Sequence, residues 1–286
     1  MRIASNWKDY ELLDASGKER LERWGDILLI RPDPQVLWET PKTHPGWKSA
    51  HARYFRSASG GGHWETYKPI PDSWQIAYGD LRFNLKPMGF KHTGIFPEQA
   101  VNWDWMSKTI QEANRPIKVL NLFGYTGAAT LACVKAGAHV THVDAAKGMV
   151  QWGKENAVAS GLADKPMRWL VDDCLKFVLR EQRRGNHYDA IIMDPPSYGR
   201  GPNGEVWKFE DQIYSFIEEC AKLLSEDPLF MVVNFYTTGL SPTIMQYIMS
   251  TILPKGDVLA EEIGLPVSES HMVLPCGASA IWTAKT

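Results

Sequence analysis

The sequence predicts an α/β fold, in which a mostly parallel sheet of seven strands carries helices on both faces behind a small β-rich domain. From about residue 117 onward, short apolar segments alternate with amphipathic ones. This alternation is typical of βαβ units, whose parallel strands are covered by helices. Ahead of it, short apolar segments such as residues 27–30 and 74–78 are separated by Gly- and Pro-rich turns, as in short β-strands. We therefore expect a substrate-recognition domain over residues 1–85 and a catalytic domain over residues 86–286.

The alternating region accounts for the predicted Rossmann-like sheet. Strands are expected at residues 117–122, 138–143, 167–171, 188–193 and 229–234. Helices are expected between them at residues 128–135, 147–159, 175–183 and 211–224. Two further strands, at residues 258–263 and 280–284, flank a stretch that contains Pro and Gly, and we expect them to complete the sheet as a hairpin.

Composition and charge exclude several classes of protein. With 286 residues and 44% hydrophobic content, the chain is long enough to bury a sizeable core. Its formal net charge of −2 does not favour a protein that coats polyanions, although a local basic patch is compatible with that sum. The cysteines and histidines show no metal-binding spacing, so no metal is expected. Scattered cysteines and the absence of a signal-peptide or membrane-spanning run predict a cytoplasmic protein without membrane contact.

Residues 42–68 combine positive charge with aromatic rings. This segment has one acid, Glu65, and its cations and rings are Lys42, Lys48, Arg53, Arg56, Lys68, Trp47, Tyr54, Phe55, Trp64 and Tyr67. Cations bind phosphates and flat rings stack on unpaired bases, so the segment is a candidate RNA-binding surface. The alternative is a solvated loop whose rings pack back onto the domain.

Two features of the alternating region indicate a nucleoside site. The first predicted strand leads into a turn with two glycines, which lets the backbone approach a ligand closely before the helix begins. This turn consists of Phe123, Gly124, Tyr125, Thr126 and Gly127. The second strand ends at Asp144 and Ala145, where a carboxylate is placed to accept hydrogen bonds from ribose hydroxyls. A plain tight turn and a helix N-cap are the alternatives for these two features.

Acidic residues also follow the third and fourth predicted strands. Ligands of open α/β sheets lie outside the carboxyl ends of the strands, so these residues face the same crevice. One of Asp172 and Asp173 is expected to accept from an adenine amino group, and the other to cap the next helix. The fourth strand ends in Asp194, Pro195, Pro196, Ser197 and Tyr198. The prolines fix an extended backbone, so that Asp194 and nearby carbonyls can hold an acceptor nitrogen while Tyr198 stacks on a planar base.

Together, the motifs NLFGYTGA, VDAA, DDCLKF and DPPSYG resemble those of class I S-adenosylmethionine-dependent methyltransferases. More narrowly, they resemble the large-subunit ribosomal RNA methyltransferases that carry a small β domain before the catalytic one. The segment KHTGIFPEQ is similar to the K-T-G-x-F-x-x-Q stretch of that group. The resemblance implies S-adenosylmethionine as cofactor, ribosomal RNA as substrate, and a role for Thr93, Gly94, Phe96 and Gln99 in wrapping the methionine end of the cofactor. It covers about residues 80–240, with a looser match over residues 10–38.

The sequence departs from this group in two places. Members that methylate carbon 5 of cytosine use a cysteine just after the fifth strand, and residues 233–239 contain none. We therefore expect transfer to a nitrogen, or less readily an oxygen, without a covalent adduct. Some relatives also carry an additional RNA-binding module, for which the first 85 residues are too short.

Three other interpretations remain open from the sequence. A nicotinamide-dependent dehydrogenase shares the sheet and the ribose-binding acid, but it would carry GxGxxG where this sequence has GxxG. An RNA-binding relative without catalytic turnover would keep the fold. A methyltransferase that acts on a protein or a small molecule would keep the chemistry as well. The sequence does not predict an oligomeric state.

Overall fold

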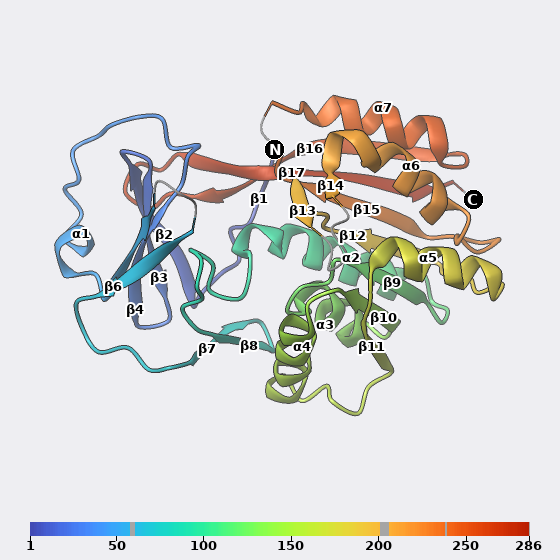
Figure 1. Ribbon diagram of the computed structural model, residues 1–286, viewed down its shortest axis with the longest axis horizontal. Coiled ribbons are helices and arrows are strands. Elements are labelled where there is room, and N and C mark those ends of the chain that lie inside the picture. Colours follow the sequence, from blue (N-terminus) through green and yellow to red (C-terminus); the bar gives the residue numbers. More distant parts are fainter. Residues whose placement is uncertain (58–60, 201–205, 238, 286) are drawn as a thin grey trace. The chain divides into compact units, whose positions relative to one another are not determined.

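A computed structural model of the chain describes residues 1–57, 61–200, 206–237 and 239–285. Within these residues, the largest sheet has eight strands in the order β1-β16-β17-β15-β12-β9-β10-β11 (Figure 1). Its parallel centre consists of β9 (Lys118–Leu122), β10 (His139–Asp144), β11 (Met167–Val171), β12 (Ala190–Met193) and β15 (Phe230–Phe235). β17 (Val273–Ala284) pairs antiparallel with β15, and next to it lies β16 (Gly256–Pro266). The predicted, mostly parallel sheet is confirmed.

The eighth strand is the difference from the predicted seven. β1 (Arg2–Ile3) pairs in parallel with β16 at Ile263 and Gly264. Two residues are too few to show the alternation or the apolar run by which a strand is recognised in a sequence.

Helices occupy both faces of this sheet. α3 (Ala128–Lys135) packs on α4 (Lys147–Ala159), whereas α6 (Phe209–Ala221) packs on both α5 (Cys174–Arg183) and α7 (Pro242–Ile252). Right-handed crossovers place a helix on opposite faces when the strand order reverses, as it does after β11. Figure 1 shows α3 and α4 together at the bottom and α6 and α7 together at the top. The predicted arrangement of helices is confirmed.

The central strands β12 and β15 are mostly apolar along their length, since both of their faces are buried. β12 and β15 contribute Ile191, Met193, Met231 and Val233 to one core cluster, and α6 adds Phe216. This continuous burial explains why these strands read as apolar runs and not as alternating patterns.

The β-rich N-terminal region forms two further sheets. The first has five strands, namely β2 (Tyr10–Ser16), β3 (Glu19–Trp24), β4 (Ile27–Pro32), β5 (Ala52–Arg56) and β6 (Gly62–Thr66). The second is a hairpin of β7 (Trp74–Tyr78) and β8 (Leu81–Leu85). Two short helical segments accompany them, α1 (Gly46–Ser49) and η1 (Pro97–Gln99). The predicted small β-rich region is therefore present.

The chain divides into two compact units. One holds residues 102–262 and 277–286 together with Met1, and the other holds residues 2–101 and 263–276. The strands β16 and β17 contribute residues to both units. We refer to the unit that holds residues 102–262 as the catalytic-fold unit and to the unit that holds residues 2–101 as the β-rich unit.

Several elements were not predicted. They are α2 (Ala100–Glu112), α7, and the hairpin of β13 (Tyr198–Arg200) and β14 (Val206–Lys208). α6 begins at Phe209, two residues before the expected start at Asp211, and ends at Ala221. Among the described residues, no helix is long and apolar enough to cross a membrane.

Candidate active site

The pairing of the strands brings the predicted site segments of the catalytic-fold unit to one edge of the sheet. Leu122 at the end of β9 lies opposite Val143 of β10 and Met193 of β12. Asp144, the last residue of β10, lies opposite Val171 of β11. The glycine turn, Asp144, the Asp172–Asp173 pair and the Asp194–Tyr198 loop therefore all leave the sheet at its carboxyl edge, where ligands of such sheets bind.

The glycine turn has an unusual backbone. Phe123, Tyr125 and Gly127 have φ angles of 54°, 51° and 84°, in the left-handed region. Residues other than glycine rarely adopt that region, because their side chains strain the backbone there. Backbone strain of this kind is frequent at functional sites. Gly127 is the N-cap of α3, so the helix begins directly after the turn.

Asp144 ties this turn to the next loop. Its Oδ2 accepts a hydrogen bond from the Tyr125 backbone N–H at 2.9 Å, and its Oδ1 accepts one from the Ala146 N–H at 2.8 Å. Burial raises the pKa of Asp144, although these two N–H groups act in the opposite direction. The N-cap of α4 is Ala146, so Asp144 does not cap that helix. Each carboxylate oxygen keeps a further lone pair for a ligand hydroxyl, and the neighbouring Ala145 is exposed.

Buried polar residues support the turn from below, and sequence reasoning missed them. His142 is fully buried, and its Nδ1 lies 2.9 Å from the Thr130 hydroxyl. Burial lowers the pKa of His142 to about 3, so the ring is neutral. A Cβ on Gly124 would lie 2.4 Å from the His142 ring, which means that the second residue of the turn has to be glycine. Asn156 of α4 donates from Nδ2 to the Thr126 carbonyl at 3.0 Å.

The two acids after β11 have different partners. Asp173 is the N-cap of α5, and its Oδ1 accepts from the Lys176 N–H at 2.8 Å. Asp172 forms an ion pair with Arg180 of α5, and its N–H donates to the Asp144 carbonyl at 3.1 Å. The capping role expected for one of the two acids therefore belongs to Asp173.

The segment Asp194–Tyr198 is held by its neighbours on three sides. The Asp194 N–H donates to the Leu122 carbonyl at 3.3 Å. Ser197 accepts from the Phe209 N–H through its carbonyl at 3.0 Å, and from the Thr237 hydroxyl through its own hydroxyl at 3.1 Å. Pro195 is buried, Pro196 is exposed, and Tyr198 is 52% exposed. We call this segment the acceptor loop.

The hairpin after the acceptor loop has two different faces. Tyr198 lies opposite Lys208 in the pairing of β13 with β14, and Gly199 lies opposite Trp207. Because side chains alternate along a strand, Tyr198, Val206 and Lys208 share one face and Trp207 occupies the other. With Asp211 and Gln212 of α6, the first face lines a hollow of about 500 Å³.

The stretch from Lys91 to Gln99 belongs to the β-rich unit. Thr93, Gly94 and Gln99 are buried there, and Phe96 packs its ring 5.2 Å from that of His92. The Thr93 hydroxyl is fully buried without a hydrogen-bond partner among the described residues. A buried hydroxyl without a partner is costly, so a ligand that supplies one fits this position.

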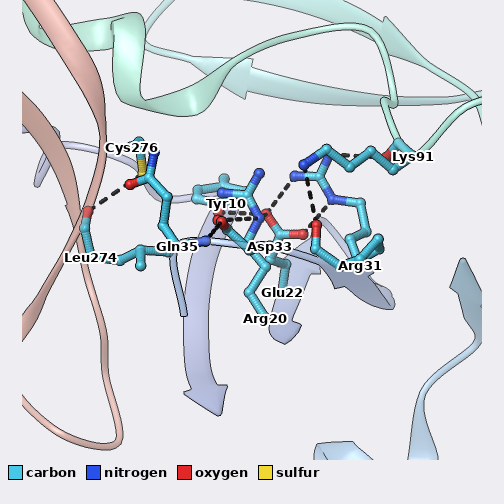
Figure 2. Close-up of polar contacts among 10 residues, drawn as sticks. Tyr10, Arg20, Glu22, Arg31, Asp33, Gln35, Lys91, Leu274 and Cys276 are labelled. Carbon is cyan, nitrogen blue, oxygen red and sulfur yellow. Dashed lines mark hydrogen bonds and ion pairs between the residues drawn. The ribbon is translucent and has the colours of Figure 1, made fainter. Parts of the chain in front are cut away.

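A cluster of buried charges anchors the start of that stretch (Figure 2). Glu22 accepts from Arg31 Nε at 2.5 Å and from Arg31 Nη2 at 2.6 Å, and the Tyr10 hydroxyl donates to the same carboxylate at 2.8 Å. Arg31 also donates to the Lys91 carbonyl at 3.1 Å, while Lys91 Nζ donates to the Pro32 carbonyl at 3.2 Å. These reciprocal bonds fix Lys91 to the end of β4.

Most of the charged and aromatic groups in residues 42–68 have internal partners. Lys42 and Arg53 both pair with Glu19 at 2.7 Å, and Lys68 donates to the Ser49 carbonyl at 2.6 Å. The indole N–H groups of Trp47 and Trp64 donate to Asp14 and to the Met88 carbonyl. Lys48 and Arg56 are exposed, and their side chains make no hydrogen bond or ion pair with described residues. Residues 58–60 of this segment lie outside the described residues.

The cysteines show no reactive environment. All four are buried, and burial raises the pKa of the Cys133 thiol to about 12 and that of Cys174 still further. Among the described residues, no group of His, Cys, Asp and Glu side chains is arranged to bind a metal.

Comparisons with known proteins agree with this geometry. The profile of the S-adenosylmethionine-dependent methyltransferase family matches residues 34–215. A crystal structure of a SAM-dependent methyltransferase from Agrobacterium tumefaciens is 36% identical, with a TM-score of 0.92 over 97% of this chain and 91% of that one. A methyltransferase structure solved as a complex with SAH has the same fold at 19% identity, with a TM-score of 0.75 over 98% of this chain and 76% of that one.

Curated relatives that match a shorter part of the chain are also methyltransferases by name. A ribosomal RNA large subunit methyltransferase K/L from Shewanella baltica is 29% identical over 150 residues, or 52% of this chain. The corresponding protein from Shewanella oneidensis is 30% identical over 129 residues, or 45% of this chain. The matched region spans about a fifth of the length of these relatives, 20% and 17% respectively.

Proposed function

Because the chain belongs to the family of S-adenosylmethionine-dependent methyltransferases, we propose that it transfers a methyl group to a nitrogen of an RNA base. The enzyme class and the cofactor follow from the family. The acceptor atom, the RNA substrate and the residue roles below are our proposal.

The observation that carries the proposal is the meeting of the strained glycine turn, Asp144 and the acceptor loop at the carboxyl edge of β9, β10 and β12. A cofactor held by the first two lies next to a substrate held by the third. Such proximity and orientation supply much of the catalysis of a group transfer.

For the cofactor, we assign the turn and the ends of β10 and β11. Asp144 binds the ribose hydroxyls with its remaining lone pairs. Asp172 is assigned to the adenine amino group because Asp173 already caps α5. The turn and the stretch after Lys91 complete the set, which consists of Thr93, Gly94, Phe96, Gln99, Phe123, Gly124, Tyr125, Thr126, Gly127, Asp144, Ala145, Asp172 and Asp173.

For the acceptor, we assign Asp194, Pro195, Pro196 and Tyr198. Tyr198 is exposed on the wall of the hollow, where its ring can stack on a base. Asp194 and a loop carbonyl accept hydrogen bonds from the N–H groups of the acceptor and so aim its lone pair. When bound, S-adenosylmethionine would supply an electrophilic methyl group to the acceptor nitrogen that these residues hold, with SAH as the leaving group and the N–H proton passing to solvent. No cysteine nucleophile is involved, since all four thiols are buried.

RNA as the acceptor rests on the relatives and on the β-rich unit. The curated relatives are ribosomal RNA methyltransferases by name, and Lys48 and Arg56 offer exposed positive charge within residues 42–68. We keep residues 1–85 as the proposed substrate-recognition domain.

The cofactor assignment is tested by calorimetric titration of S-adenosylmethionine into wild-type protein, Asp144→Ala and Asp144→Asn. Loss of a hydrogen bond to a charged group costs about 1.5–3 kcal/mol, so we expect the Kd to rise about 10- to 100-fold in Asp144→Ala. Asp164→Ala removes an exposed acid of the same unit and is expected to leave the Kd unchanged. Wild-type affinity in both Asp144 variants would exclude the assigned ribose contact.

The acceptor is tested separately with radiolabelled S-adenosylmethionine and RNA or protein from cells. Label in RNA that appears, after digestion to nucleosides, as a base methylated on nitrogen supports the proposal. Label in protein instead, or on ribose oxygen, would contradict it, as would a covalent adduct with RNA that contains 5-fluorocytosine.

A further inference from the structure

From the ψ angle of Asp194 to the ψ angle of Pro196, the two prolines of the acceptor loop restrict every backbone rotation except the last. Proline fixes φ at Pro195 and Pro196, and a residue that precedes proline is restricted to an extended ψ. Asp194 and Pro195 both precede proline, so their ψ angles are confined. Pro196 is followed by Ser197, and its ψ therefore remains to be set by a contact elsewhere in the fold.

That contact comes from Trp207. Its indole Nε1–H donates to the Pro196 carbonyl at 2.6 Å, which fixes the peptide plane between Pro196 and Ser197. Trp207 lies on the inner face of the β13–β14 hairpin, opposite Gly199, where no side chain competes for the space.

The same side chain reaches the cofactor turn. The Trp207 ring packs 5.6 Å from the ring of Phe123, the first residue of the turn, and 5.6 Å from Phe216 of α6. Phe123 and Phe216 also contact each other at 5.6 Å, so the three rings form one cluster. Trp207 thus contacts the acceptor loop through its N–H group and the cofactor turn through its ring.

We propose that Trp207 is a positioning residue, which sets the orientation of the acceptor loop relative to the cofactor turn. It touches neither reactant. The proposal rests on the assignment of the acceptor loop in the proposed function, and it adds a residue that lies outside the four sequence motifs. Methyl transfer requires the acceptor nitrogen in line with the methyl group, and a displacement of about 1 Å can cost about 100-fold in rate.

The test compares Trp207→Phe with Trp105→Phe. Trp207→Phe keeps an aromatic ring but removes the N–H donor. Trp105 of α2 is a matched control, because it is also partly buried and packs on a phenylalanine, Phe230, at 5.2 Å, but its indole N–H makes no hydrogen bond to any residue that the structure describes.

Two measurements are made on each variant. Hydrogen exchange of peptides that cover residues 194–199 should be faster by about fivefold in Trp207→Phe, since a hydrogen bond contributes about 1 kcal/mol to the closed state. The turnover number with RNA should fall about 10- to 100-fold, while the Kd of SAH and the KM for S-adenosylmethionine stay at the wild-type values. Trp207→Ala, which also loses the ring contact with Phe123, should in addition weaken SAH binding.

The exchange measurement needs no substrate, so it separates this inference from the proposed function. Unchanged exchange at residues 194–199, or an equal increase in Trp105→Phe, would overturn the role of Trp207 whatever the substrate is. Faster exchange with an unchanged turnover number would also overturn it. If wild-type protein methylates no RNA but Trp207→Phe shows the local increase in exchange, the anchoring of the loop stands and the RNA proposal fails.

Discussion

At the scale of single residues, Glu22 shows how a buried charge can stabilise the β-rich unit. Its side chain is fully buried and receives two hydrogen bonds from Arg31 and one from Tyr10. Burial alone raises the pKa of this carboxyl, but Arg20 and Arg31 outweigh it and lower the pKa to about 2. Breaking such a pair leaves an uncompensated charge inside the protein, which costs far more than the loss of a surface pair.

We therefore expect Glu22→Gln to lower the free energy of unfolding by about 3–5 kcal/mol, because Arg31 remains buried without its counter-charge. The control Glu11→Gln removes the exposed partner of Arg23 and should cost less than about 1 kcal/mol. Urea denaturation of both variants at neutral pH provides the comparison. Equal effects in the two variants would contradict this account of Glu22.

The same carboxyl predicts a pH dependence. Its pKa falls from 4.5 to about 2 on folding, so the unfolded chain binds more protons between these values. The contribution of Glu22 to stability is complete above pH 4.5 and is lost as the pH falls toward 2. Urea midpoints measured across this range should decline less steeply in Glu22→Gln than in the wild type.

At the scale of elements, the glycine turn depends on the strand beneath it. Gly124 lies over the buried ring of His142, and Gly127 begins α3 at a φ of 84°. The motif in the sequence predicts a close approach of the backbone to a ligand. The structure shows that part of the requirement for glycine comes from below, since the His142 ring fills the space of a Cβ.

Gly124→Ala should consequently displace the turn and weaken S-adenosylmethionine binding by at least about tenfold, because the new methyl group would meet the His142 ring. Gly148→Ala in α4 is the matched control. Outside its chain neighbours and the backbone of its own helix, no atom of the described residues lies within 4 Å of its added Cβ, and alanine favours a helix over glycine by about 1 kcal/mol. Calorimetric affinity and thermal unfolding of both variants test this, and equal affinities would refute the proposed constraint.

At the scale of the whole molecule, the distribution of charge decides where RNA can be contacted. The formal net charge of −2 includes the basic segment of residues 42–68. Most of its cationic side chains form internal pairs with Glu19 or with a backbone carbonyl. Lys48 and Arg56 are the exposed cations of this segment whose side chains make no hydrogen bond or ion pair with described residues. The proposed RNA surface is thus narrower than the composition of residues 42–68 indicates.

The double variant Lys48→Glu/Arg56→Glu should bind RNA at least about tenfold more weakly and lose about 0.7 in the salt slope for each phosphate contact removed. Lys154→Glu/Lys165→Glu changes the net charge equally at exposed positions of the catalytic-fold unit. Filter binding across a series of salt concentrations, with S-adenosylmethionine affinity as the check on folding, makes the comparison. An equal loss in both double variants would assign the effect to net charge alone.

Much of the fold follows from local patterns. The helices at residues 128–135 and 147–159 have the predicted bounds, because glycines mark their ends: Gly127 and Gly137 flank the first helix, and Gly161 follows the second. α7 and the β13–β14 hairpin were missed. The hairpin strands have three residues each, too few for any periodicity, and Trp207 of β14 packs on Phe123 and Phe216 from other elements.

The sequence by itself determined the α/β class, the cofactor family and the segments at the carboxyl edge, because each depends on residues close together in the chain. Tertiary structure decided how those segments are held. The His142 ring packs under Gly124 of the turn, Arg180 forms an ion pair with Asp172, and Trp207 donates a hydrogen bond to the acceptor loop. Each of these side chains contacts a segment outside its own helix or strand. Contacts of this kind leave no periodic or local signal, so they become visible only when the strands are paired in space.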